Sequence, residues 1–270
     1  MKPRETFHLI PGMLDPIPAL SDNYIWMVQK NGHAVVVDPG EADPVLARLG
    51  ALGLTLEAIL ITHHHHDHTG GVPALQQRTG ATVYGPRNEA LPVCDRRLAE
   101  GDTVTLPATG LQFKVLDVPG HTAGHIAYFG HLDTQGPVVF CGDTLFAVGC
   151  GRVFEGTPAQ MLASLDKISG LPSDTLVCCA HEYTQSNIRW ALHVEPHNTA
   201  LQARAAETDR LRAKGLPTVP SRLAQEHDTN PFLRVRVAAV QKAVQQHTGV
   251  GGHTDVAVFA ALREWKNNFR

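Results

Sequence analysis

The sequence Thr62-His63-His64-His65-His66-Asp67-His68 contains, after its threonine, five histidines and one aspartate in six consecutive positions. Imidazole and carboxylate groups are common ligands of zinc and of non-haem iron. The run follows residues 56–61, a mostly apolar stretch typical of a buried strand, and precedes Gly70-Gly71 and a short helical pattern from Pro73. Polar residues that end a strand often build a site in α/β proteins. The run therefore predicts a metalloenzyme.

A histidine run can also be a purification tag or a low-complexity metal buffer. A tag lies at a terminus and has no embedded aspartate, and a buffer lies in a polar, disordered segment. The run from His63 to His68 is internal and directly follows an apolar strand pattern. The sequence therefore favours a folded metal site over both alternatives.

Length and composition exclude several classes of protein. A chain of 270 residues can form one large or two modest domains with a core. The formal net charge of −3 gives no general attraction to nucleic acid or to an anionic membrane. We find no apolar run of about twenty residues and no apolar stretch after Lys2 and Arg4, so we expect neither a membrane span nor a secretory signal.

The cysteines favour a reducing compartment, the cytoplasm. They are few and irregularly spaced, with no C-x-x-C pair, so neither a disulfide framework nor a thiolate zinc site is expected. The five positions are Cys94, Cys141, Cys150, Cys178 and Cys179. We expect Cys141, beside a strand, to be a buried core thiol rather than a ligand.

The chain divides into a strand-rich front and a helical back. Short apolar or β-branched segments predict strands at 34–37, 81–84, 111–118, 137–141 and 175–180. The first of them is followed by Asp38-Pro39-Gly40, a sequence typical of a turn. Helices are expected at 43–52 and between the cap Thr157 and Gly170. Longer helices are expected at 199–214, 231–246 and 254–266. The pattern predicts a two-sheet domain at residues 1–181 and a helical domain at residues 182–270.

Three more predicted strands end in ligand-type residues, namely His121, Asp143 and His181. In an extended segment residues two apart point the same way, so His63 and His65 can share one ion. Asp67 and His68 lie past a bend and can serve a second ion. His121 and His181 can each add one ligand, and the carboxylate of Asp143 suits a bridge between ions about 3.5 Å apart.

These residues together resemble the metallo-β-lactamase superfamily. The resemblance implies an α+β fold, a four-layer αββα sandwich with the metal site at one edge. It implies that one ion is held by His63, His65 and His121, that the other is held by Asp67, His68 and His181, and that Asp143 bridges them. Asp143 and Asp67 are the expected catalytic carboxylates. His64 and His66 are expected to point away from the metals, and His125 to be structural. The remaining histidines are expected at the surface: His8, His33, His131, His193, His197, His227, His247 and His253.

Finer motifs are similar to those of the glyoxalase II family, the hydroxyacylglutathione hydrolases. They are Gly142-Asp143-Thr144-Leu145-Phe146, Gly149-Cys150-Gly151-Arg152-Val153-Phe154-Glu155-Gly156, His181-Glu182-Tyr183-Thr184, Val194-Glu195-Pro196, Asn230-Pro231-Phe232-Leu233-Arg234 and Leu262-Arg263-Glu264-x-Lys266-x-x-Phe269. The resemblance covers nearly the whole chain. It implies hydrolysis of S-D-lactoylglutathione to D-lactate and glutathione, a step of methylglyoxal detoxification. It also implies a glutathione site lined by Arg152, Val153, Phe154, His181, Tyr183, Arg263 and Lys266.

The sequence departs from the family pattern at a few positions. Phe154 stands where relatives have tyrosine or phenylalanine, and it cannot donate a phenolic hydrogen bond. Some relatives have lysine at the position of Arg152, and an aromatic or small residue at that of His66. None of these differences affects an expected metal ligand, so they bear on affinity rather than on the type of reaction.

Other activities of the same superfamily remain as alternatives. A glutathione persulfide dioxygenase would use one iron and generally lacks the helical tail, and a β-lactamase would lack the glutathione-binding tail. A nuclease would need a basic face, and a non-catalytic metal protein would not explain Arg152 or Lys266. We expect two divalent ions, and zinc is the first expectation. Iron and manganese remain alternatives, because histidine and aspartate bind all three metals. We expect a monomer that acts on a glutathione thioester and has no nucleic-acid or membrane partner.

Overall fold

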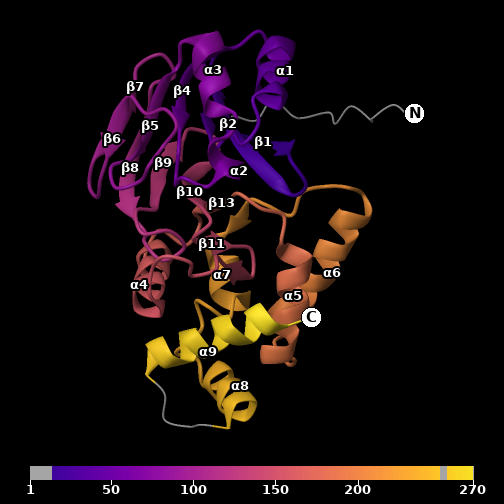
Figure 1. Cartoon of the computed structure of the whole chain (residues 1–270). Coiled ribbons are helices and arrows are strands. Elements are labelled where there is room, and N and C mark those ends of the chain that lie inside the picture. Colours follow the sequence, from indigo (N-terminus) through magenta and orange to yellow (C-terminus); the bar gives the residue numbers. More distant parts are fainter. Residues whose placement is uncertain (1–13, 250–253, 270) are drawn as a thin grey trace.

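The computed structural model describes residues 14–249 and 254–269. Two six-stranded sheets lie together in the upper half of Figure 1, and the C-terminal helices lie below them. Within the described ranges, no helix combines the length and the apolar composition needed to cross a membrane.

The first sheet has its strands in chain order, β1 to β6. Their bounds are Leu14–Ala19, Asn23–Lys30, His33–Val37, Thr55–Leu60, Thr82–Pro86 and Arg96–Leu98. The first three strands pair antiparallel, whereas β3, β4, β5 and β6 pair in parallel. The predicted strands at 34–37, 56–61 and 81–84 correspond to β3, β4 and β5.

The second sheet has the order β14-β13-β10-β9-β8-β7. In chain order the bounds are Thr103–Leu106 (β7), Leu111–Asp117 (β8), Ile126–Leu132 (β9), Gly136–Gly142 (β10), Leu176–Cys179 (β13) and Ser221–Arg222 (β14). Strand β9 is antiparallel to both β8 and β10, and β13 is parallel to β10. The carboxyl ends of β8, β10 and β13 therefore meet at one edge of the sheet.

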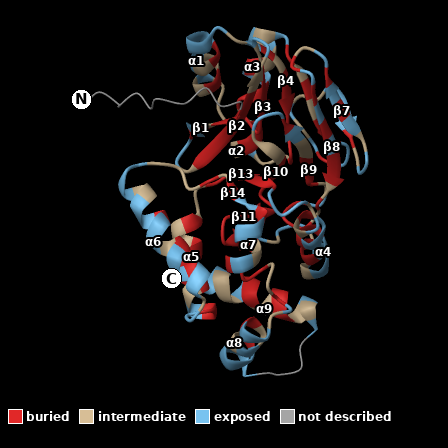
Figure 2. Ribbon diagram, turned by 180° about the vertical axis from the view of Figure 1, so that it is seen from behind, coloured by how far each residue is buried: buried red, intermediate tan, exposed pale blue. Residues whose placement is uncertain are grey.

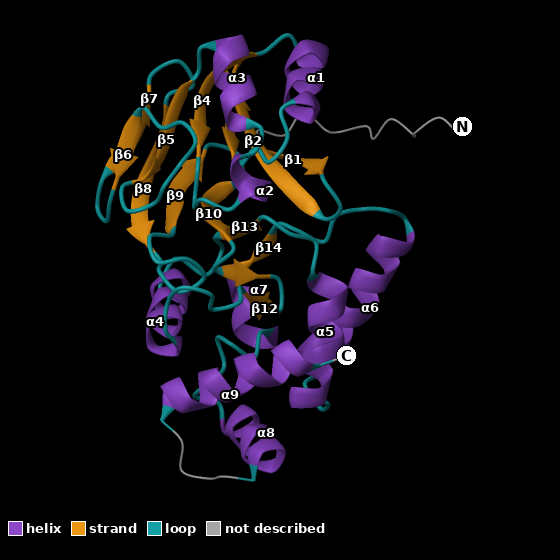
Figure 3. Cartoon of the chain, in the orientation of Figure 1, coloured by secondary structure: helices purple, strands orange, loops and turns teal. Residues whose placement is uncertain are grey.

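Alternating side chains divide the core into two layers. In β2, Trp26 and Val28 face the second sheet, whereas Ile25 and Met27 face the helices on the outer side of the first sheet. Those outer helices are α1 (Asp43–Leu52) and α3 (Val72–Thr79). Helix α4 (Pro158–Ser169) adds its apolar face to the core on the side of the second sheet. The layers are thus helix, sheet, sheet and helix, as predicted (Figure 3).

Helix α4 begins as its sequence predicts. The side chain of Thr157 accepts a hydrogen bond from the backbone of Gln160, and the Gln160 side chain accepts one from the Thr157 backbone. The helix ends before Gly170.

The C-terminal segment is mostly helical. Its helices are α5 (Thr184–Val194), α6 (Thr199–Ala213), α7 (Leu223–Thr229), α8 (Ala238–Thr248) and α9 (Asp255–Asn268). Figure 2 shows that α6 and α8 keep much of their surface exposed. The sequence did not indicate α5, α7 or the short strand β14, which joins this segment to the second sheet through β13.

The helix predicted at 231–246 was wrong at its start, because α8 begins only at Ala238. The backbone N–H groups of Leu233 and Arg234 donate to carbonyls three residues earlier, as in turns rather than in an α-helix. The guanidinium of Arg234 also pairs with the buried carboxylate of Glu195, at 2.8 Å. This tertiary contact outweighs the helical propensity of the segment.

Candidate metal centre

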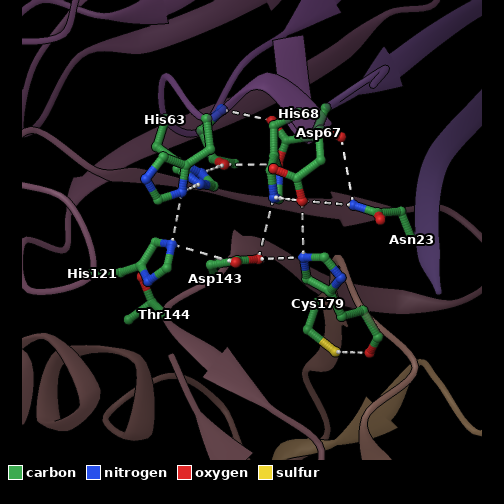
Figure 4. Close-up of polar contacts among 12 residues, drawn as sticks. Asn23, His63, Asp67, His68, His121, Asp143, Thr144 and Cys179 are labelled. Atoms are coloured by element: carbon green, nitrogen blue, oxygen red, sulfur yellow. Dashed lines mark hydrogen bonds and ion pairs between the residues drawn. The ribbon is translucent and has the colours of Figure 1, made fainter. Parts of the chain in front are cut away.

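Four strand ends bring seven ligand-type side chains together at one edge of the sandwich. His63 and His65 follow β4, and Asp67 and His68 belong to the short helix α2 (His66–Thr69). The other three follow β8, β10 and β13, in the order His121, Asp143 and His181. In Figure 4 Asp143 lies between His121 on one side and His68 with Asp67 on the other.

The first cluster consists of three imidazoles. Nδ1 of His65 lies 3.1 Å from Nε2 of His63 and 3.1 Å from Nε2 of His121. Ligand atoms on a tetrahedral zinc ion with bonds of about 2.0–2.1 Å lie about 3.3–3.4 Å apart. The three nitrogens therefore have nearly the spacing that one metal ion requires.

The second cluster contains one carboxylate and two imidazoles. Oδ2 of Asp67 lies 3.4 Å from Nε2 of His68 and 3.4 Å from Nε2 of His181. The ligand atoms of these three residues all lie within 4.8 Å of one another. This spacing also fits a single metal ion.

Asp143 connects the two clusters through its two carboxylate oxygens. Oδ2 lies 3.4 Å from Nε2 of His121, whereas Oδ1 lies 3.4 Å from Nε2 of His68 and 3.3 Å from Nε2 of His181. Oδ1 of Asp143 and Nε2 of His68 are buried and have no hydrogen-bond partner among the described residues. Buried polar atoms in proteins normally have partners, so this pair of atoms fits a site built for bound cations.

Outer hydrogen bonds fix the imidazole tautomers. Asp38 accepts from Nδ1 of His68 at 3.0 Å and from the hydroxyl of Thr62 at 2.7 Å. The Thr62 oxygen in turn lies 3.0 Å from Nδ1 of His63 and accepts its proton, because the only hydroxyl proton of Thr62 goes to Asp38. Each bond holds a proton on Nδ1 and leaves Nε2 open toward the cluster.

The other two Nε2-facing histidines are held in the same way. Nδ1 of His121 donates to the carbonyl of Arg152 at 2.9 Å, and Nδ1 of His181 donates to Asp22 at 2.8 Å. The amide of Asn23 donates to Oδ2 of Asp67 at 3.1 Å (Figure 4). The sequence prediction missed Asp22, Asn23 and Asp38. Of these, only Asp38 could have been recognised, because it directly follows a strand as the predicted ligands do.

Glu89 connects the histidine run to the loop that contains His121 through hydrogen bonds. Its buried carboxylate accepts from the backbone and the ring of His64, and also from the hydroxyl of Thr122 and the N–H of Gly124. His64 thus points away from the clusters, as predicted, and His66 is exposed.

His125 is fully buried and packs beneath the first cluster. Its ring stacks on that of His63 with centroids 4.6 Å apart, and its Nε2 accepts from the backbone N–H of Asp143 at 3.2 Å. This agrees with the expected structural role. Among the other histidines, His131, His193, His197 and His247 are exposed, and His33 and His227 are half-buried. His8 and His253 lie outside the described residues.

The electrostatics of the two clusters differ. Burial, together with neighbouring histidines, holds the pKa of His63 well below its usual value, so its ring is neutral and able to bind a cation. Burial would also lower the pKa of His181, but Asp143 and Asp67 raise it to about 10. The same attraction outweighs burial at Asp143 and lowers the pKa of that carboxyl. The carboxylates of Asp67 and Asp143 thus stabilise positive charge in the second cluster.

A cleft of about 520 Å³ leads from the clusters to the C-terminal helices. Its lining residues are His121, Asp143, Phe146, Cys150, Arg152, Phe154, Tyr183, Ser186, Asn187, Arg263, Lys266, Asn267 and Phe269. Three of them are cationic: Arg152, Arg263 and Lys266. Burial and the nearby arginines lower the pKa of Lys266 to about 8. The cleft therefore joins a candidate metal centre to a concentration of positive charge.

Five of the seven residues predicted to bind substrate line this cleft. The two that do not are Val153, which packs partly buried against the core, and His181, whose ring stacks on that of Tyr183 with centroids 4.7 Å apart. Phe154 is 60% exposed, and its ring centroid lies 5.3 Å from that of His121. Phe154 thus flanks the first cluster at the cleft.

Comparisons with known proteins agree with this geometry. The family model described as "Metallo-beta-lactamase superfamily" matches residues 20–181, and the one described as "Hydroxyacylglutathione hydrolase C-terminus" matches residues 182–269. A hydroxyacylglutathione hydrolase of Albidiferax ferrireducens is 56% identical over 256 residues, which cover 95% of this chain and 99% of that protein.

Two solved structures show the same fold. ETHE1 from Myxococcus xanthus superposes with a TM-score of 0.63 at 25% identity, covering 93% of this chain and 98% of that one. TTHA1623, solved in a di-iron-bound form, gives a TM-score of 0.58 at 28% identity and covers 81% of this chain and 100% of that one.

Proposed function

The chain belongs to the hydroxyacylglutathione hydrolase family, and we propose that its thioester hydrolysis takes place where the cleft meets the two ligand clusters. The reaction converts S-D-lactoylglutathione to D-lactate and glutathione. One observation supports this location: a single cleft is lined both by Asp143 and His121 of the clusters and by the cations Arg263 and Lys266. The thioester carbonyl and the charged ends of glutathione need such a pair of subsites.

Seven side chains are proposed to hold two divalent ions. His63, His65 and His121 would hold one ion and Asp67, His68 and His181 the other, and the carboxylate of Asp143, which faces both clusters, would serve both. The spacing of the ligand atoms supports this assignment, as does the lack of a hydrogen-bond partner for the buried atoms Oδ1 of Asp143 and Nε2 of His68 among the described residues. Bound divalent ions of this kind lower the pKa of water from about 15.7 to near 7 and polarise carbonyl groups.

The protein's own contribution is to orient the reactants. The Asp143 carboxylate borders the cleft between the clusters and orients the attacking water. The amide of Asn23 donates to Asp67 and orients this carboxylate within the second cluster. The leaving group is a thiolate, and since a thiol pKa is about 8.5, the step needs little general-acid assistance.

The three cations of the cleft are proposed to bind the glutathione moiety. Glutathione carries two carboxylates and one ammonium group, and the protein has a net negative charge of −3. Local cations are therefore required, and charge-assisted hydrogen bonds contribute about 1.5–3 kcal/mol each. Arg152, Arg263 and Lys266 provide them, with Phe154 and Tyr183 as flanking rings.

Several finer assignments complete the proposal. Zinc is the proposed metal, with iron and manganese as the competitors that the same ligands accept. We propose a cytoplasmic monomer in which residues 1–181 carry the metal centre and residues 182–270 carry the C-terminal part of the glutathione site.

The decisive experiment is incubation with S-D-lactoylglutathione, following the loss of thioester absorbance, together with metal analysis of the same sample. Hydrolysis that depends on about two metal ions per chain is expected. Turnover of a small uncharged thioester with no turnover of the glutathione thioester would refute the substrate assignment while leaving a metallohydrolase.

A further inference from the structure

A hairpin next to Asp143 forms part of the cleft. It consists of β11 (Leu145–Phe146) and β12 (Gly149–Cys150), which pair antiparallel. Phe146 and Cys150 line the cleft, and Arg152 follows two residues later. The position of this hairpin therefore helps to set the shape of the proposed glutathione site.

The hairpin is held by buried polar groups from the C-terminal segment. The amide nitrogen of Asn230 donates to the carbonyls of Phe146 and Gly149 at 3.1 and 2.9 Å. Oε2 of Glu226 accepts from the backbone N–H of Val148 at 2.9 Å and lies 3.1 Å from the amide nitrogen of Asn230. Glu226 and Asn230 are fully buried.

Two more residues support this arrangement. Asn187 of α5 donates to the carbonyl of Ala147 at 3.0 Å. Arg204 of α6 pairs with the other oxygen of Glu226 at 2.5 Å, so the buried carboxylate has a cationic partner. We call Asn187, Arg204, Glu226 and Asn230 the hairpin socket.

The hairpin needs such support because its turn is strained. Val148 has a φ of +56°, a conformation that is a clear outlier for a β-branched residue. Backbone strain of this kind persists only where surrounding contacts impose it. The bond from the Val148 N–H to Glu226 is such a contact.

Beyond the hairpin the chain is fixed at a second point. The carbonyl of Arg152 accepts from His121, as described above, and the N–H of Gly151 donates to the carbonyl of Thr144 at 3.2 Å. Loss of the socket would therefore release the hairpin end of the loop while the Arg152 end stays attached to the metal centre.

We propose that Glu226 and Asn230 are positioning residues that set the hairpin of residues 145–150 for recognition of the glutathione moiety. The proposal gives the motif Asn230-Pro231-Phe232 a role, and it assigns the C-terminal segment a task besides supplying Arg263 and Lys266. Its substrate part rests on the proposed function. Its structural part, that the socket holds the strained hairpin, can be tested without substrate.

The test uses Glu226→Gln and Asn230→Ala, with Glu195→Gln as the matched control. Glu195 is also a buried carboxylate of the C-terminal segment, but its partner is Arg234, at 2.8 and 2.9 Å. Hydrogen exchange of residues 145–150, thermal stability, metal content and kinetics are measured for each protein. If Glu226→Gln does not fold, Asn230→Ala, which leaves the Arg204–Glu226 pair in place, decides.

In both socket variants the backbone amide hydrogens of residues 145–150 are expected to exchange faster. KM for S-D-lactoylglutathione should rise about tenfold, equivalent to about 1.4 kcal/mol. Metal content and turnover of a small uncharged thioester should stay near wild type. The control should lose stability without either change. Unaltered exchange and KM in a folded socket variant, or equal changes in the control, would overturn the proposal. If the wild type does not hydrolyse the glutathione thioester, the proposed function fails, and the exchange data alone decide whether the socket holds the hairpin.

Discussion

Oδ2 of Asp38 lies 3.0 Å from Nδ1 of His68, and both side chains are buried. Asp38 also accepts from the backbone N–H and the hydroxyl of Thr62. One carboxylate thus orients an imidazole of the second cluster and, through Thr62, an imidazole of the first. A residue that does not line the cleft thereby controls ligands of both proposed metal sites.

Asp38→Ala is expected to weaken metal binding about 10–100-fold, because loss of an outer partner lets a ligand imidazole rotate or change tautomer. Metal titration monitored by calorimetry measures the effect. Asp15→Ala is the control, since Asp15 is also buried but pairs with Arg48 at 3.0 Å on another part of the first sheet. Equal metal affinity in Asp38→Ala and Asp15→Ala would contradict the assigned role.

Asp143→Asn tests the proposed bridge. The substitution keeps the shape of the side chain but removes the negative charge that faces both clusters. Metal affinity of at least one site should fall by more than about tenfold, since even outer residues contribute at that level, and kcat should fall steeply. Stoichiometry by elemental analysis and turnover are measured together. Two bound ions with near-normal turnover would exclude the bridging role.

Lys266→Met tests the substrate site more cleanly than a change of Arg263 does. Nη1 of Arg263 donates to the carbonyl of Cys150 at 2.8 Å, so removing Arg263 also disturbs the hairpin, whereas Nζ of Lys266 donates to the carbonyl of Ser186 on α5, at 3.1 Å. Lys266→Met should raise KM for the glutathione thioester about tenfold, with both metals retained and a small uncharged thioester turned over normally. An unchanged KM would remove Lys266 from the site.

The positions of His121 and His181 could be predicted because each follows an apolar strand. An apolar segment followed by a ligand-type residue can be recognised within a few positions of sequence, and the sandwich fold then brings these strand ends together. Asp38 also follows an apolar strand, but the sequence Asp38-Pro39-Gly40 indicated only a turn. Its role depends on the parallel pairing of β3 with β4, which brings Thr62 and His68 to it. Contacts between distant segments leave no local periodicity.

The hairpin socket shows the same limit. The carbonyl of Phe146 and the amide of Asn230 are 84 positions apart in the chain. The motif around Asn230 indicated the family but not its physical task. Likewise, the helical pattern at 231–246 could not show that Arg234 pairs with Glu195 and delays the start of α8.

The pH dependence of substrate binding provides the last prediction. Burial, Arg263, Arg189 and Arg152 lower the pKa of Lys266 in the free protein to about 8. Only the protonated ammonium attracts a carboxylate of glutathione. As the pH rises through about 8, the free protein loses this charge, and KM for the glutathione thioester should rise. A bound carboxylate favours the protonated form, so kcat should change less than KM over the same range.

Lys266→Arg is the matched variant, because a guanidinium stays charged throughout this pH range. Steady-state kinetics between about pH 7 and pH 9.5 should show a rising KM in the wild type and a flat KM in Lys266→Arg. A small uncharged thioester reports any alkaline change at the metal centre, since it does not need the cation. The same alkaline rise of KM in wild type and Lys266→Arg would mean that another group titrates, and Lys266 would then not be the cation that senses pH.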